Sequence, residues 1–590
     1  MSFADRLYRR FLRTVRTLND RQMMMVLAVV VGLLAGVVTW IFELLLHTIR
    51  EALTSWFNVE SESYLYLIYP VVGVILVTLF VKYVVKDNIS EGVTRVLYAM
   101  SKKSSRIKSH NMWTSVVGGA TTIGFGGSVG PEAPIVLTGA AIGSNVGRAL
   151  RLNYKQSTLL LCCGAGAAVA AIFKAPIAGL VFVLEILMLE MTAASIIPLL
   201  LATIGGTTLA FALRGFDPII AVNVPELFVI RNIPMYALLG VACGLVAYYF
   251  ASVNSAVARF FGRFDHVWQK WLVGGAVLGV LLFLFPPLYG EGYEALGELM
   301  HGRMDTLFEN SLFYKYRAIP WVVIAFLLAA LFLKVVATAT TNAAGGVGGT
   351  FAPSLFVGAF TGGATAFVCN YMFGMELPLV SFTLVGMAGV MAGVMKAPLT
   401  SIFLIAELSN GYGLFIPLMI TTAISFMIDY WLDPDSIYTK QLRQRGELLS
   451  HDKDASVMVF LHLDKLMETD FLPIGVGDTL GDAVKVISRA RRNVFPVVDS
   501  GGVLVGIVQL DDMRVDMFRP EKYSTPVTAY MIQPPDRILP NEQVASVLSR
   551  FDETGTWTLP VVDKAGRYLG FLSKSRILAS YREQLVEISQ

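Results

Sequence analysis

The amino-acid sequence predicts an all-α membrane block of two related, inverted halves with interrupted helices, followed by a smaller cytoplasmic α/β block. Of its 590 residues, 55% are hydrophobic and only 15% are charged, whereas soluble globular domains carry roughly 25% charged residues. The deficit is uneven, because 35 of the 91 charged residues fall in the last 140 positions. Two internal repeats, one in each block, support the same division. The composition excludes a wholly soluble enzyme and a secreted disulfide scaffold. The net charge of +3 is too small to indicate nucleic-acid binding.

The first predicted span follows a basic N-terminus. An uncharged run from Met23 to Phe42 is long enough to cross the roughly 30 Å hydrocarbon core as a helix. No small-residue cleavage site follows it, so we expect an uncleaved span rather than a signal peptide. The positive-inside rule then predicts a cytoplasmic N-terminus. The basic residues at the N-terminus are Arg6, Arg9, Arg10, Arg13, Arg16 and Arg21.

Six more apolar runs are candidates for membrane helices. They are Ser63–Val81, Gln156–Phe173, Met191–Leu213, Trp271–Gly290, Ala318–Leu333 and Leu408–Ile428. The stretch from Val335 to Ile428 carries only three charged residues, Glu376, Lys396 and Glu407, and is broken by glycine clusters. Non-helical backbone at membrane depth is tolerated only where it lines a protein cavity. The glycine breaks therefore predict interrupted helices whose ends meet inside the protein.

An internal repeat divides the membrane block into halves at 1–230 and 231–448. The segment Gly126–Pro134 (GGSVGPEAP) matches Gly345–Pro353 (GGVGGTFAP), and a second pair of segments, Lys174–Glu185 and Lys396–Glu407, follows in the same order. Glycine- or proline-interrupted segments at corresponding positions of two halves are the best sequence indication of a binding site at the membrane midplane. The alternative is that these glycines only allow close helix packing.

Each copy of the first motif is typical of a helix start, with Gly130 and Pro134 in one half and Gly349 and Pro353 in the other. A helix N-terminus leaves backbone N–H groups unpaired and carries about half a positive charge. Two such ends pointed at one place would bind an anion without a buried lysine or arginine. Conduction requires binding weak enough for release, and neither glycine cluster has a basic residue beside it.

Glu132 is the only charged residue between Lys108 and Arg148. An intramembrane carboxylate is costly and functional by default. At a helix start it would occupy the anion site when ionised and leave when protonated or displaced, which makes it a gate. The alternative is a carboxylate that only caps its helix. The symmetric pair Glu185 and Glu407 is expected to have a structural role, and Lys174 and Lys396 are expected to be helix-end residues.

These motifs resemble the CLC family of chloride channels and chloride/proton exchangers. The segment Gly130–Pro134 is similar to the family's G-x-E-G-P motif, which makes Glu132 the match to the external gating glutamate. The segment Gly349–Pro353 is similar to G-x-F-x-P, which implies that the backbone N–H groups of Thr350 and Phe351 contact a central anion. Tyr438 resembles the tyrosine whose hydroxyl completes that site. The resemblance also implies a homodimer with one pore per subunit.

Two positions depart from the family pattern. The anion-binding serine of its G-S-G-I-P loop aligns with Asp87, which we expect to point away as a helix cap, so that Asn88 and backbone N–H groups at Ile89 and Ala133 bind the anion. The proton-transfer glutamate that exchangers often carry after the Glu185 equivalent is Ile186 here. Because isoleucine cannot carry a proton, this position favours a passive channel.

The final block contains a second repeat. The segment Phe495–Asp499 matches Leu559–Asp563, each followed by turn glycines and a short apolar run. This resembles a tandem pair of CBS domains, at 449–522 and 523–590. The family's ribose-binding pattern is incomplete in both repeats, leaving only Asp512 in one and Ser573 in the other. Two roles stay open for the pair: binding of an adenine nucleotide, or structural dimerisation.

The main expectation is a voltage- or pH-gated chloride channel of the plasma membrane, multi-pass, with both termini cytoplasmic; it is not an enzyme and requires no cofactor. The alternative is a chloride/proton antiporter. A transporter of another anion or of a divalent cation ranks lower, because the acids of the membrane block are isolated whereas divalent cations need clustered oxygen ligands. The six histidines include no His-Glu-x-x-His pair, which argues against an intramembrane metalloprotease. The four cysteines lie in apolar segments, so we predict no metal site.

Overall fold

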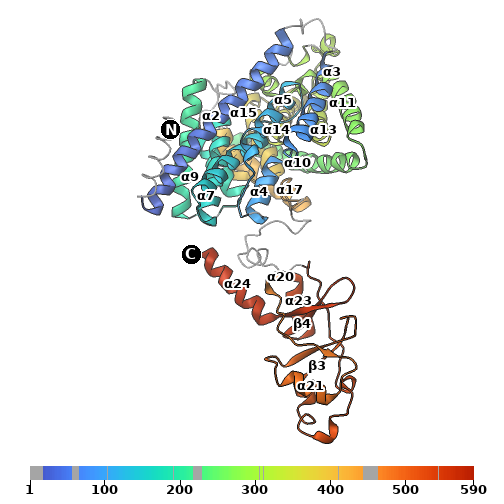
Figure 1. Ribbon diagram of the computed structural model, residues 1–590. Coiled ribbons are helices and arrows are strands. Elements are labelled where there is room, and N and C mark those ends of the chain that lie inside the picture. The colour runs from blue at the N-terminus through green and yellow to red at the C-terminus, as the bar shows by residue number, and fades with distance from the viewer. Residues whose placement is uncertain are drawn as a thin grey trace. The chain divides into compact units, whose positions relative to one another are not determined.

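In the computed structural model the chain forms two compact units, Met1–Leu448 and Leu449–Gln590, which are described separately (Figure 1). The structure describes residues 18–55, 65–102, 104–189, 192–216, 229–303, 306–309, 311–409, 411–440, 442, 463–542 and 544–589. Five of the N-terminal arginines, Arg6, Arg9, Arg10, Arg13 and Arg16, lie outside these residues.

In the part of the chain that the structure describes, the first half of the membrane unit contains eight helices. They are α2 (Asp20–Ser55), α3 (Leu65–Leu79), α4 (Gly92–Lys102), α5 (Thr114–Gly124), α6 (Glu132–Ala149), α7 (Tyr154–Phe173), α8 (Pro176–Glu185) and α9 (Ala193–Arg214). Short turns of other helix types follow α3 and precede α5, namely η1 (Phe80–Val85) and η2 (Ser109–Met112).

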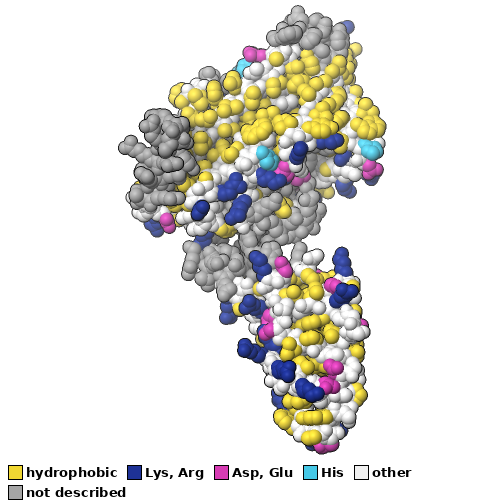
Figure 2. Space-filling view, viewed as in Figure 1, with side chains coloured by type: hydrophobic (Ala, Val, Ile, Leu, Met, Phe, Trp, Pro, Cys, Tyr) yellow, Lys and Arg dark blue, Asp and Glu magenta, His cyan; other side chains and the backbone are white. Residues whose placement is uncertain are grey.

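The second half repeats this pattern. Its helices are α10 (Ile233–Phe261), α11 (Val267–Leu284), α12 (Tyr293–Met300), α13 (Pro320–Ala343), α14 (Phe351–Phe373), α15 (Leu379–Met395), α16 (Pro398–Leu408) and α17 (Phe415–Leu432). Among the described residues, nine helices are long and apolar enough to cross a membrane. On the face drawn in Figure 2, apolar side chains cover a broad belt of this unit, and lysines and arginines gather along one edge of the belt.

The apolar runs of the sequence differ from these helices in three places. The predicted span Leu408–Ile428 begins too early, because Leu408 is the last residue of α16 and α17 begins at Phe415. Helix α10 was missed, although the uncharged run from Ile233 to Ala258 is a clear signal for it. The predicted span Trp271–Gly290 is too long, because α11 ends at Leu284. The consecutive prolines Pro286 and Pro287 explain this end, since proline removes a backbone donor and clashes with the preceding turn.

Glycines bring equivalent helix pairs of the two halves into close contact. In the first half, a Cβ added at Gly139 of α6 would overlap the carbonyl oxygen of Gly164 in α7. In the second half, a Cβ at Gly358 of α14 would overlap the carbonyl oxygen of Gly386 in α15. The repeated glycines within these helices therefore do serve close packing, whereas those before the helix starts meet at a different place.

Helices α8 and α16 cap one another. The carboxylate of Glu185, the last residue of α8, accepts hydrogen bonds from the backbone N–H groups of Leu399 (2.9 Å) and Thr400 (2.7 Å) at the start of α16. The carboxylate of Glu407 accepts from Ile177 N (3.0 Å) and Ala178 N (2.8 Å) at the start of α8. The two glutamates thus satisfy unpaired donors of the opposite half, which is the structural role expected from their symmetry. Lys174 and Lys396 end α7 and α15, both in the left-handed conformation.

The second unit contains two similar β-hairpins with flanking helices. Its elements are α20 (Leu463–Leu466), β1 (Ile474–Gly475), α21 (Leu480–Ile487), β2 (Val494–Val498), β3 (Leu504–Gln509), α22 (Leu510–Met513), α23 (Val544–Thr554), β4 (Thr558–Val562), β5 (Tyr568–Ser573) and α24 (Lys574–Ser589). The pairs β2–β3 and β4–β5 are antiparallel and share a bulge at equivalent positions. In each hairpin an aspartate, Asp499 or Asp563, accepts two backbone hydrogen bonds in the turn.

Candidate functional site

The two glycine motifs meet inside the membrane unit. Gly130 and Gly349 form a two-residue antiparallel bridge, in which Gly130 N donates to Gly349 O (2.9 Å) and Gly349 N donates to Gly130 O (2.8 Å). Two residues after each glycine a helix begins, α6 at Glu132 and α14 at Phe351. A Cβ at either glycine would overlap the Glu132 carboxylate. Glycine at both positions therefore leaves room for this carboxylate, and the bridge places the two helix starts next to one another.

The carboxylate of Glu132 lies at the start of the helix of the opposite half. Its side chain is buried, with 1% exposure, and Oε1 accepts a hydrogen bond from Phe351 N at 2.5 Å. Oε2 is also buried and has no hydrogen-bond partner among the described residues. An acidic side chain of this chain thus occupies the positive end of α14, which is where the sequence predicted an anion to bind.

Two further hydroxyl groups lie at the same place. Thr350 is the residue before α14, and Tyr438 follows α17; both hydroxyl oxygens are buried without a hydrogen-bond partner in the described part of the chain. The Glu132 carboxylate acts electrostatically on the Tyr438 phenol, and the Thr350 side chain lies beside that phenol. The structure therefore brings Glu132, Thr350, Phe351 and Tyr438 together, with neutral donors available to an anion.

A third helix start, that of α4, contacts the same region. A Cβ at Gly92 would overlap the carbonyl oxygen of Ala133, and Thr94 Oγ1 donates to Tyr438 O at 3.4 Å. Ile89 is buried at 1% exposure, where it packs with Val77 and Val347. Asn88 and Ile89 therefore lie in the loop that leads into α4.

The side-chain oxygen of Asn88 is already used within this loop. Asn88 Oδ1 accepts from Ser90 N (2.9 Å) and Ser90 Oγ (2.6 Å). The backbone N–H of Asn88 donates to Asp87 Oδ1 at 3.0 Å, so anion binding by Asn88 would fall to its amide N–H₂.

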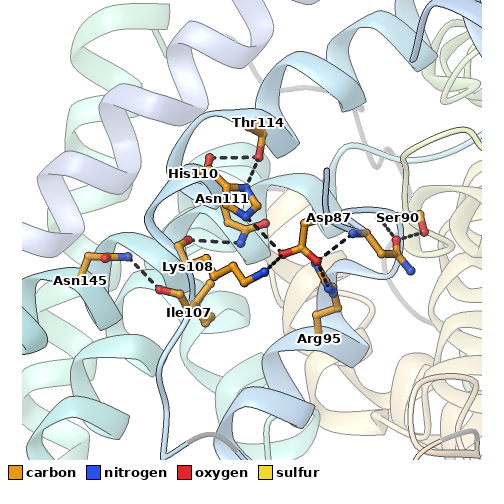
Figure 3. Close-up of polar contacts among 10 residues, drawn as sticks. Asp87, Ser90, Arg95, Ile107, Lys108, His110, Asn111, Thr114 and Asn145 are labelled. Carbon is orange, nitrogen blue, oxygen red and sulfur yellow. Dashed lines mark hydrogen bonds and ion pairs between the residues drawn. The ribbon is translucent and has the colours of Figure 1, made fainter. Parts of the chain in front are cut away.

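Asp87 does not cap a helix, so that expectation was wrong. Its carboxylate contacts two cations and a histidine: Oδ1 accepts from Arg95 (3.0 Å), and Oδ2 contacts Lys108 Nζ (3.0 Å) and His110 Nε2 (3.2 Å) (Figure 3). Partial burial would raise the pKa of Asp87, but the hydrogen bonds from Arg95 and Lys108 hold it well below its ordinary value. The negative charge is thus matched by cations that come from separate segments. Their convergence depends on the tertiary fold, and a sequence pattern does not reveal it.

Sequence reasoning also missed the segment between α11 and α12. Ser128 Oγ, in the first glycine motif, donates to Leu288 O (2.7 Å). Lys334 of α13 is completely buried, and its Nζ donates to Leu288 O (3.1 Å) and Gly290 O (2.8 Å). The available signal was Lys334 itself, a lone charge at the end of the apolar run Ala318–Leu333.

The two residues predicted for a nucleotide site, Asp512 and Ser573, differ in their exposure to solvent. Ser573 is buried, and its hydroxyl donates to the carboxylate of Glu468, which also pairs with Arg492. Asp512 is exposed in α22. The Ser573 hydroxyl is thus engaged within the unit, by a glutamate that the sequence analysis did not single out. Among the described residues no cluster of three potential metal ligands occurs.

Known protein families match both units of the chain. The family model described as Voltage gated chloride channel matches residues 72–430, and that described as CBS domain matches 463–516 and 527–583. The H(+)/Cl(-) exchange transporter ClcA of Vibrio parahaemolyticus is 28% identical, over 73% of this chain and 90% of that protein. Chloride channel protein CLC-f of Arabidopsis thaliana is 26% identical over 67% of this chain, which spans only 56% of the plant protein.

Solved structures share the fold. A slow cyanobacterial Cl-/H+ antiporter aligns with a TM-score of 0.63 at 24% identity, covering 72% of this chain and 98% of that one. A eukaryotic CLC transporter aligns with a TM-score of 0.60 at 16% identity, covering 94% and 97%. Together with the family matches, these alignments account for an all-α membrane unit followed by a small α/β unit.

Proposed function

Because the chain belongs to the voltage-gated chloride channel (CLC) family of membrane transport proteins, and is thus not an enzyme, we propose that it exchanges chloride for protons. One observation carries this proposal: the Glu132 carboxylate occupies the start of α14 and accepts the Phe351 N–H at 2.5 Å. The ionised carboxylate and a chloride ion would then compete for a single place, and protonation of Glu132 would free that place for chloride. The relative named an H(+)/Cl(-) exchange transporter supports the antiporter over the channel that Ile186 favoured.

The proposed step is an alternation at the start of α14. Ionised Glu132 is held by the Phe351 N–H and by the positive end of the helix. A protonated, neutral carboxyl loses this attraction and leaves the helix end, so that the N–H becomes available to chloride. The same exchange can also begin with chloride, which displaces the carboxylate to a place where the carboxylate takes up a proton. Each occupant excludes the other, which couples the two fluxes.

The Thr350 and Tyr438 hydroxyls are proposed to hold chloride on the inner side of this gate. Both are buried and have no partner in the described part of the chain, and both are neutral donors. Neutral donors bind a chloride ion weakly enough to release it, as conduction requires. The Asp87 cluster keeps a carboxylate of the same region paired with Arg95 and Lys108, which would reduce its repulsion of an anion.

A passive channel is the second candidate, and Ile186 is the observation that favours it. This residue directly follows Glu185 and is buried at 4% exposure. An apolar side chain there offers no group to relay a proton toward the cytoplasm. Exchange by this chain would therefore need water or another group on the inner proton path, whereas a channel would not.

Reconstituted protein distinguishes the two candidates. Liposomes with an outward chloride gradient are followed for chloride efflux and internal pH at once. An exchanger moves protons inward against their own gradient, whereas a channel moves chloride without protons. Chloride movement with no uphill proton movement would contradict the exchanger. Flux of a different anion only, with none of chloride, would contradict both readings.

The assembly and location are proposed from the same family membership. We expect a homodimer with one pore per subunit, in the plasma membrane, with the C-terminal CBS pair and the N-terminus in the cytoplasm. Arg21, at the start of α2, supports the orientation through the positive-inside rule. Cross-linking of the reconstituted protein would test the dimer, and protease access to the C-terminal unit in sealed vesicles would test its side.

Adenine nucleotide binding by the CBS pair is a weaker proposal. Two polar side chains match the family's ribose-binding pattern, Asp512 and Ser573, but Glu468 already accepts the Ser573 hydroxyl. Calorimetric titration of the full-length protein with ATP tests the point. The Glu468→Ala variant frees the Ser573 hydroxyl, so it should bind ATP more tightly than the wild type. If neither protein gives a heat of binding, the CBS pair has a structural role only.

A further inference from the structure

A cavity of about 440 Å³ lies between the end of α2 and the segment that joins α11 to α12. We call it the outer cavity, because it lies at the end of α2 opposite its predicted cytoplasmic start. Its wall carries four glutamates and one arginine, Glu291, Glu294, Glu298, Glu309 and Arg50. Such a wall repels chloride, so these carboxylates call for a role other than anion binding.

The cavity wall is fastened to the loop that carries the gate. Ser128, four residues before Glu132, donates through Oγ to Leu288 O at 2.7 Å. Tyr289 Oη donates to Gly124 O at 2.8 Å. Gly126 adopts a φ of 90°, and a Cβ there would press against the Tyr289 ring. Leu288 and Tyr289 thus contact the start of the first glycine motif and the residue Gly124 just before it.

Lys334 secures the same segment from the opposite side. Its Nζ donates to Leu288 O (3.1 Å) and to Gly290 O (2.8 Å), and lies 4.9 Å from the centre of the Phe356 ring. The Leu288 carbonyl therefore accepts hydrogen bonds from both Ser128 Oγ, in the gate loop, and Lys334 Nζ. A buried cation is costly unless it is paired, and Glu291, next to Gly290, is the acidic group that acts on Lys334.

We propose that Glu291 is a second charge of the external gate: in its ionised form it favours the protonated form of Glu132, and Lys334 fixes the backbone segment that carries Glu291. The inference rests on the proposed function, since it assigns a role in the same chloride/proton exchange. Glu291 contacts no transported ion, so it is a positioning residue that acts through Glu132. A like charge nearby makes a carboxylate retain its proton.

Several charged or titratable groups on the surrounding helices interact electrostatically with Glu291. They are Arg50 and Glu43 on α2, Glu132 on α6, Tyr293 and Glu294 on α12, and Lys334 on α13. Desolvation raises the pKa of Glu291 to about 7, against the opposing effect of Arg50 and Lys334. Glu291 is therefore charged above about pH 7 and increasingly neutral below it, so its effect on Glu132 should be greatest on the alkaline side.

The test compares chloride flux with external pH for full-length protein in liposomes. Glu291→Gln removes the negative charge, so protonation of Glu132 should require a lower pH. We expect the midpoint of the flux profile to move toward acid by on the order of half a pH unit, roughly threefold in proton affinity. Glu291→Asp should keep the wild-type midpoint. The matched control is Glu309→Gln, an exposed acid of the same cavity, which should also leave the midpoint unchanged.

A double variant shows whether Glu291 acts through the gate. In a Glu132→Gln background, Glu291→Gln should cause no further change in the pH profile, and a shift that persists there would overturn the inference. An unshifted midpoint in Glu291→Gln alone would also overturn it, provided that wild-type flux depends on pH. Absence of chloride flux in wild-type protein would instead overturn the proposed function.

Discussion

The Glu132 carboxylate accepts a hydrogen bond from Phe351 N through Oε1, whereas Oε2 is buried without a partner in the described structure. An unpaired buried oxygen costs on the order of 1–3 kcal/mol, which offsets part of the attraction between this side chain and the helix end. A side chain held with such a penalty is suited to leave its site. A tightly held carboxylate would serve a structural purpose and not a gate.

Replacement of Glu132 by glutamine should fix the gate in its neutral state. Glutamine cannot ionise, so we expect chloride flux to persist and to lose its dependence on external pH, and coupled proton movement to stop. Flux measured across a pH series in liposomes checks this. The matched control is Glu376→Gln, an exposed acid between α14 and α15, which should behave as wild type. A Glu132→Gln protein with an unchanged pH profile would refute the assignment.

Asp87 offers a stability prediction at the same scale. Asp87→Asn removes the charge that pairs with Arg95 and Lys108, which should lower the free energy of unfolding by about 1 kcal/mol, since one cation is well exposed. The folded pKa of Asp87 is lowered, so this contribution is present above the ordinary aspartate pKa of about 3.9. It is lost as the pH falls toward the folded value.

Thermal unfolding in detergent at neutral and acid pH measures the effect. Glu91→Gln in the same loop serves as the control, because the Glu91 side chain is exposed. The stability difference between Asp87→Asn and wild type should shrink as the pH falls, and a difference that grows in acid would contradict the role assigned to the Asp87 charge.

At the scale of helices, the reciprocal caps formed by Glu185 and Glu407 should contribute similar amounts to the free energy of unfolding. Glu185→Ala and Glu407→Ala each remove two charge-assisted bonds to backbone N–H groups. Each should lower the free energy of unfolding by about 1–3 kcal/mol, and by similar amounts. Thermal unfolding checks this, with Glu376→Ala as the control. Loss of proton coupling in Glu185→Ala at unchanged stability would instead point to a direct transport role.

Much of the element pattern could be predicted from the sequence. The repeated glycine and proline positions predicted two helix starts, because these residues have few other uses at such spacing, and α6 and α14 begin there. The sequence predicted that helix starts of the two halves meet, but not which individual groups contact one another. That Glu132 meets Phe351, or that Glu185 caps α16, depends on the way the two halves interlock. The Asp87 cluster and the Lys334 carbonyl contacts likewise join segments that are distant in sequence.

At the scale of the whole molecule, the two halves contribute opposite parts of one site. The first half supplies the acid, Glu132, and the second half supplies the donors, Phe351 N and the hydroxyls of Thr350 and Tyr438. Neither half forms the site alone. The scarcity of charge in the membrane block agrees with the proposed site, in which backbone N–H groups at helix starts would bind chloride less tightly than charged side chains.

Chloride binding to purified protein as a function of pH tests the central claim most directly, namely that chloride and the Glu132 carboxylate compete for the start of α14. Calorimetric titration with chloride should show affinity that rises as the pH falls in wild-type protein. In Glu132→Gln the affinity should be high and independent of pH. Equal pH dependence in the two proteins, or wild-type affinity that falls in acid, would contradict the account.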